Sequence, residues 1–150
     1  VPAEIEKVRR LLERPHVHLA LDPEFAIAEG QKPGTHIGEL TAAQITEAQN
    51  ILAALVTEKG LPPKILIVHQ FLENMILGKQ ELQPVAGVQV VIESDGFGTP
   101  ALKQQVYEVL ITNDEYEYSG IKHFYKQDVP VMTPAATLDL DPSPDLVIYQ

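Results

Sequence analysis

The sequence predicts an α/β protein in which parallel strands alternate with helices. Apolar runs typical of buried strands recur between segments that carry helical periodicity or helix-capping signals. The predicted strands are almost continuously apolar, which indicates a parallel sheet whose two faces are both covered. Polar or aromatic residues follow the apolar part of every predicted strand. The functional side chains are therefore expected at the edge of the sheet where these strands end.

Five segments carry helix signals. The longest begins with a capping box formed by Thr41 and Gln44 and ends at Gly60. Two later segments begin with Thr-Pro, in which the threonine caps the helix and the proline takes its first position. The first segment has an apolar face, and the third, which follows the second predicted strand, is short and weak. In chain order the predicted helices are "PAEIEKVRRLLER" (2–14), "TAAQITEAQNILAALVTEKG" (41–60), "LENMILG" (72–78), "TPALKQQVYEVLI" (99–111) and the helix start "TPAAT" (133–137).

Five apolar segments alternate with these helices and predict strands. They are "HVHLALDPEF" (16–25), "KILIVHQF" (64–71), "GVQVVIESDGFG" (87–98), "SGIKHFY" (119–125) and "DLVIYQ" (145–150). No linker or internal repeat interrupts the pattern, so the 150 residues are expected to form a single α/β unit.

Two architectures contain such a unit: the C-terminal five strands of a (β/α)8 TIM barrel, or an open doubly wound five-stranded sheet. In a barrel every strand reaches the site, whereas an open sheet binds ligands mainly at one switch point. The polar ends of all the predicted strands favour the barrel, which needs about 250 residues. Leu19, Ile67, Val91 and Ile148, assigned to the barrel interior, would then be partly exposed in this chain alone. We therefore expect the rest of the barrel from the same polypeptide or from another chain.

Composition narrows the function classes. The formal net charge of −10 argues against nucleic acid or an anionic membrane as a partner. No apolar run is long enough to predict a membrane-spanning segment. The absence of cysteine excludes a disulfide framework, a thiol nucleophile and a cysteine zinc site. No Gly-x-Ser-x-Gly motif is present, which argues against a serine hydrolase.

Two pairs of carboxylates lie where predicted strands end. Asp22 and Glu24 flank a proline, and Glu93 and Asp95 have the same two-residue spacing, which places both on one face of an extended strand. One carboxyl that donates a proton beside another that stays ionised is what glycoside hydrolysis requires. The structural alternative is a pair of solvated strand-exit turns. The candidate catalytic residues are Asp22, Glu24, Glu93 and Asp95.

Further polar and aromatic residues accompany these carboxylates. Aromatic faces beside hydrogen-bonding groups suit sugar rings, which present apolar C–H faces and hydroxyl edges. Ordinary packing is the alternative for many of them. The candidate substrate-binding residues are His69, Gln70, Phe97, His123, Tyr125, Tyr149 and Gln150.

A metal site would join His69 and His123 to the candidate carboxylates. No local metal-binding signature supports such a set, because His16 and His18 lie at the opposite end of their strand. A single histidine at a strand end is more commonly structural. The sequence therefore predicts no metal ligands and no cofactor, and a metal-dependent hydrolase is the third hypothesis for function.

Six segments resemble a family of bacterial secreted or lipoprotein-type proteins with a TIM-barrel, glycoside-hydrolase-like fold. They are "HLALDPEF", "IGELTAAQITEAQNILAALV", "LPPKILIVHQF", "VIESDGFGTPALK", "GIKHFY" and "PDLVIYQ". The resemblance spans nearly the whole chain and implies the C-terminal part of the barrel and an extracytoplasmic, secreted or lipid-anchored location. It supplies no catalytic residues that could be carried over.

The leading expectation is a glycoside-hydrolase-like, carbohydrate-active domain that uses its strand-end carboxylates for acid/base cleavage. The alternative is a non-catalytic module that binds a carbohydrate or cell-wall glycan on the same scaffold.

Overall fold

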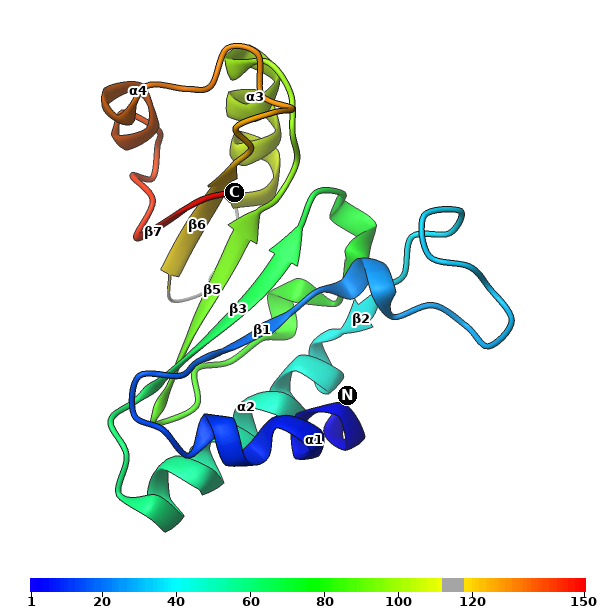
Figure 1. The fold of residues 1–150 in the computed structure, drawn as a ribbon, viewed down its shortest axis with the longest axis vertical. Coiled ribbons are helices and arrows are strands. Elements are labelled where there is room, and N and C mark those ends of the chain that lie inside the picture. The colour runs from blue at the N-terminus through cyan, green and yellow to red at the C-terminus, as the bar shows by residue number, and fades with distance from the viewer. Residues whose placement is uncertain (112–117) are drawn as a thin grey trace.

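The computed structural model describes residues 1–111 and 118–150. It confirms an α/β fold in which parallel strands alternate with helices (Figure 1). The helices are α1 (Pro2–Leu12), α2 (Ala42–Lys59), α3 (Pro100–Ile111) and α4 (Pro134–Leu138), and the 3-10 turns are η1 (Pro23–Phe25), η2 (Glu73–Met75) and η3 (Lys79–Glu81). The strands are β1 (Leu19–Leu21), β2 (Leu40–Thr41), β3 (Lys64–Gln70), β4 (Ile76–Leu77), β5 (Val88–Ser94), β6 (Tyr118–His123) and β7 (Leu146–Tyr149).

Five strands form one sheet with the order β1-β3-β5-β6-β7, and every neighbouring pair is parallel. Each later strand is added on the same side of the sheet, which is the order of an arc cut from a barrel. A doubly wound sheet contains a reversal of strand order, and the described strands of this sheet contain none. The sheet is curled into a half-barrel (Figure 1).

The helices begin and end where local chemistry predicts. Thr41 and Gln44 form the predicted capping box of α2, and Gly60 ends that helix in the left-handed conformation at φ 62°. Thr99 accepts the Leu102 N–H at the start of α3, as an N-cap does. None of the helices in the described ranges is long and apolar enough to cross a membrane.

The main core lies between the sheet and the helices that cover it. Alternate residues of β3 and β5 face α2 and α3, and their side chains are at most 5% exposed. Helix α1 lies beside α2 and completes this layer (Figure 1). The core includes Leu66 and Val68 of β3, Val90 and Ile92 of β5, Ile45, Leu52 and Leu55 of α2, and Tyr107 and Leu110 of α3.

The other face of the sheet carries a second apolar surface. Ile67 pairs in register with Val91, and Ile148 with Lys122, so these residues share that face. Ile67 and Ile148 are half-buried, as predicted. Two predictions were wrong. Val91 is only 5% exposed, and Leu19 lies on the helix side because its partner in register is Leu66.

The predicted helix at 72–78 is also wrong. This segment forms the 3-10 turn η2 and the two-residue strand β4, whose Ile76 and Leu77 pair with Leu40 and Thr41 of β2 in a separate small parallel sheet. Gly78, at φ 69°, then redirects the chain into η3. The crossover from β3 to β5 therefore contains short turns where the alternation predicts an α-helix.

Candidate active site

A cavity of about 680 Å³ opens at the carboxyl ends of the strands, at the edge where the sequence predicts the chemistry. Residues from the ends of β1, β3, β5, β6 and β7 line it, together with one side of α3. Its polar lining includes Asp22, Glu24, Asp95, Lys103, Lys122 and Gln150, and its aromatic lining is Phe25, Phe71, Phe97 and Phe124. Three of the predicted carboxylates, Asp22, Glu24 and Asp95, therefore line one cavity.

Glu24 is held over the cavity by the turn that ends β1. Pro23 takes the first position of η1, and the Asp22 carboxylate accepts the Glu24 N–H at 3.3 Å. The Glu24 carbonyl accepts the N–H of Gly38 at 3.0 Å, so the long loop after η1 returns to its own start. Only glycine fits there, because a Cβ on Gly38 would lie 2.5 Å from the carbonyl oxygen of Pro23.

The surroundings of Glu24 favour its protonated form. Partial burial raises the pKa of Glu24, and the negative charges of Asp22 and Asp95 raise it further. The positive charges of Lys122 and His69 oppose this shift without cancelling it. A carboxylic acid of this kind is able to donate a proton to a leaving group.

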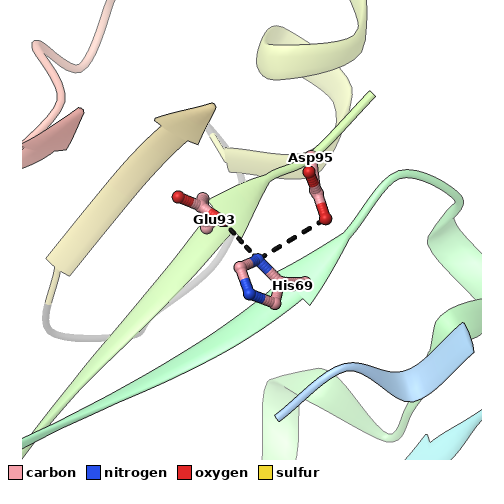
Figure 2. Close-up of side chains that lie close together, drawn as sticks. All are labelled: His69, Glu93 and Asp95. Atoms are coloured by element: carbon pink, nitrogen blue, oxygen red, sulfur yellow. Dashed lines mark ion pairs between the residues drawn. The ribbon is translucent and has the colours of Figure 1, made fainter. Parts of the chain in front are cut away.

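Four ionisable side chains form a cluster at the ends of β3, β5 and β6. His69 and Glu93 are partners in register, and the Nδ1 atom of His69 contacts Oε2 of Glu93 and lies 3.5 Å from Oδ2 of Asp95 (Figure 2). The Lys122 ammonium is 2.9 Å from Oδ1 of Asp95 and 4.0 Å from Oε2 of Glu93. Glu93 and Asp95 therefore lie on one face of the sheet, as their spacing predicts. Asp95 lines the cavity and is paired with Lys122, whereas Glu93 is fully buried.

A glycine on the neighbouring strand leaves room for Glu93. Gly120 is the partner in register of Glu93 on β6. A Cβ on Gly120 would lie 3.3 Å from the Cβ and Cγ atoms of Glu93 and 3.0 Å from Cγ1 of Val91. Such contacts are tighter than ordinary packing, so a larger residue would push Glu93 toward His69 or displace the strand.

A buried lysine ties together two loops that border the cavity. Lys103 of α3 donates to the carbonyl oxygen of Gly96 at 2.6 Å and to that of Lys122 at 2.7 Å. Its ammonium also lies 3.1 Å from Oδ2 of Asp128. Burial lowers the pKa of Lys103, and the hydrogen bond and charge of Asp128 counteract that shift. The segments after β5 and β6 are thereby fixed to the same helix.

Asp128 also holds the segments after β5 and β6 in place. Its two oxygens accept the backbone N–H groups of Gly98 at 2.8 Å and Phe124 at 2.9 Å. Burial alone would raise the pKa of Asp128, but these two hydrogen bonds and Lys103 outweigh it and lower the pKa. Asp128 is therefore a structural carboxylate that positions Phe97 and Phe124 at the cavity.

The structure separates the predicted site residues into two groups. Asp22, Glu24, Asp95, Phe97 and Gln150 line the cavity, and His69 and Glu93 contact the lining residue Asp95 or its partner Lys122. The remaining predicted residues, Gln70, His123, Tyr125 and Tyr149, are not among the residues that line it.

Each member of the second group has another role. Gln70 donates to the carbonyl oxygens of Leu72 and Glu73, which fixes the turn after β3. His123 is fully buried, with Nε2 2.9 Å from the Thr137 hydroxyl on α4. Tyr125 and Tyr149 stack on each other with ring centroids 5.7 Å apart.

Two lysines of the site, Lys103 and Lys122, were not predicted from the sequence. Lys122 lies two residues after Gly120, so it shares the face of Glu93 once the β5–β6 register is known. Lys103 is set in an amphipathic helix, where a lysine is usually exposed. The signal in the sequence for Lys122 is its place at a strand end, next to His123. No signal in the sequence marks Lys103.

No protein-family model, curated protein or solved structure matches this chain. Its function is therefore argued from the side chains of the cavity and their surroundings.

Proposed function

We propose that the cavity is a glycoside-hydrolase-like site that binds a carbohydrate or cell-wall glycan and cleaves a glycosidic bond by acid/base chemistry. Glu24 is the general acid in this proposal, and Asp95 is the ionised partner. The observation that carries it is the contrast between two carboxyl groups that line one cavity. Partial burial and the nearby charges of Asp22 and Asp95 raise the pKa of Glu24, whereas Asp95 is paired with the ammonium of Lys122.

The two carboxyl groups enter the cavity from different strands. Glu24 follows β1 and Asp95 follows β5, and β3 lies between those strands in the sheet. A substrate bound above the end of β3 would thus lie between a proton donor and a carboxylate. Carboxyl groups whose surroundings favour opposite protonation states are the usual mark of an acid/base pair.

The other carboxylates support this pair. Asp22 caps the turn that carries Glu24 and adds negative charge that favours its protonated form. Glu93 is fully buried and orients His69 and Lys122 beside Asp95. Glu93 is therefore a positioning residue rather than a group that touches substrate.

Aromatic side chains at the cavity suit a sugar ring. Phe25 is 58% exposed and Phe97 is 64% exposed, although both line the cavity. Phe97 packs edge-on against Phe124 at 6.2 Å between ring centroids, which fixes its orientation. Exposed apolar faces next to hydrogen-bonding groups such as Gln150 are typical of carbohydrate sites.

We also infer that additional strands cover the second face of the sheet, from the same polypeptide or from another chain. Strands β1 and β7 are the sheet edges, and the apolar side chains of Ile65, Ile67, Leu146 and Ile148 on that face are only half-buried. Covering them would bury apolar surface and pair open strand edges. If light scattering finds a monomer, and its stability to unfolding does not change over a wide range of protein concentration, a second copy of the chain does not cover this face.

An extracytoplasmic location is a further proposal and rests on the family resemblance alone.

The test is a screen of oligosaccharides and cell-wall glycans with detection of new reducing ends. Replacing a general acid is expected to reduce turnover by about 10²–10⁴-fold, so Glu24→Gln should lose cleavage and keep binding. Glu6→Gln is the matched control, since Glu6 is exposed on α1, a helix that contributes nothing to the cavity. Binding without cleavage by the unmodified chain would overturn the catalytic proposal in favour of a binding module. Equal cleavage by Glu24→Gln would overturn the assignment of Glu24.

A further inference from the structure

We propose that His69, Glu93 and Asp95 bind one divalent transition-metal ion beside the cavity that Asp95 lines. This site goes beyond the proposed function and does not rest on it, because metal binding can be measured without any glycan.

Three atoms that can bind a metal lie close together. The Nδ1 atom of His69 and one oxygen each of Glu93 and Asp95 all lie within 4.8 Å of one another (Figure 2). A tetrahedral zinc ion with bonds of about 2.1 Å places its ligands about 3.4 Å apart. The separation between Nδ1 of His69 and Oδ2 of Asp95 is 3.5 Å.

The second observation is a buried carboxylate oxygen without a partner. Glu93 is 0% exposed, and its Oε1 atom has neither a hydrogen bond nor an ion pair within the described part of the chain. Its Oε2 atom contacts Nδ1 of His69, a residue that is 9% exposed, and lies 4.0 Å from the Lys122 ammonium. Buried polar atoms are nearly always satisfied, and leaving a carboxylate without hydrogen bonds is costly. A cation between the three side chains would satisfy all of them.

The types of ligand and the access of solvent to the metal position are those of a catalytic metal site. One imidazole with two carboxylates suits zinc and related transition metals better than calcium or magnesium, which prefer oxygen alone. Three protein ligands leave a coordination position open, as in catalytic zinc sites. Asp95 lines the cavity, so this open position is reachable from solvent.

Lys122 is the group that competes with the ion. Its ammonium lies 2.9 Å from Asp95 and 4.0 Å from Glu93, so it already neutralises part of their charge. Removing that positive charge should strengthen binding of a divalent cation by about tenfold or more, because like charges repel strongly at such distances. An ordinary cluster of ion pairs predicts no such gain.

The experiment is a calorimetric titration of the chelator-treated full chain with Zn²⁺, combined with elemental analysis of the stoichiometry. We expect one Zn²⁺ per chain, loss of that site in Asp95→Asn and His69→Gln, and tighter binding in Lys122→Met. His16→Gln is the matched control, because His16 is exposed and lies before β1, at the opposite end of the sheet. Circular dichroism identifies any variant that fails to fold, and the comparison of Lys122→Met with the unmodified chain still tests the site.

Several results would overturn the proposal: absence of stoichiometric zinc, binding that survives Asp95→Asn, or binding that is lost in His16→Gln. Failure of the proposed function looks different. A chain that binds zinc without cleaving any glycan keeps the metal site and removes the glycosidase, whereas a chain that cleaves a glycan but takes up no stoichiometric zinc in the titration does the reverse.

Discussion

Replacing Lys103 with methionine tests the physical account of how the cavity is held open. The substitution replaces the lysine by an unbranched apolar side chain of nearly the same length and removes the ammonium. That ammonium is part of a side chain that is 2% exposed, and it contacts Asp128 and the carbonyl oxygens of Gly96 and Lys122. Lys103→Met therefore leaves a buried carboxylate without its cation and two carbonyl groups without a donor.

The expected loss of stability is large. Breaking a buried ion pair from one side costs about 3–5 kcal/mol, against about 5–15 kcal/mol for the total stability of a domain. The Gly98 and Phe124 N–H groups still bind Asp128, so the loss should lie at the lower end of that range. The double variant Lys103→Met/Asp128→Asn removes both charges, and it should be less destabilised than the sum of the two single variants.

Urea unfolding followed by far-UV circular dichroism measures these differences, since the chain has no tryptophan for fluorescence. We expect the midpoint of Lys103→Met to fall while the m-value stays constant. A loss below about 1 kcal/mol, or single-variant losses that simply add, would show that the pair is not coupled in the way the buried contacts imply.

Three further predictions concern the site. Because the general acid must be protonated, cleavage should fall as the pH rises through the raised pKa of Glu24, and a rate that instead increases there would contradict its role. Gly38→Ala should both destabilise the fold and reduce cleavage, because its Cβ would lie 2.5 Å from the carbonyl oxygen of Pro23. A variant with the melting temperature and activity of the unmodified chain would contradict this close contact. The stabilisation from Asp128, whose folded pKa is lowered, is present above its unfolded pKa and is lost as the pH falls toward the folded one, so Asp128→Asn should flatten the acid limb of a stability–pH curve.

The features that the sequence predicted correctly depend on local chemistry or on strand direction. The capping box of Thr41 and Gln44 and the left-handed Gly60 are set by residues within a turn of each other. The parallel sheet follows from apolar strands separated by crossovers, and parallel strands bring their carboxyl ends to one edge. That rule alone was enough to bring Asp22, Glu24 and Asp95 into one cavity.

The features that it missed depend on register and on partners far along the chain. The two-residue strand β4 forms because Ile76 and Leu77 meet β2, which no local pattern shows. The three-residue strand β1 pairs Leu19 with Leu66, and a shift of one residue would have put it on the other face. The burial of Lys103 likewise depends on acceptors from two separate loops.

The most direct test of the proposed function is a proton NMR time course of the best glycan from the screen, incubated with the unmodified chain. The account predicts that signals of a new reducing-end anomeric proton appear with the unmodified chain and are absent with Glu24→Gln. Release of a different group with the glycosidic bonds intact, or line broadening by binding with no new signals, would contradict it.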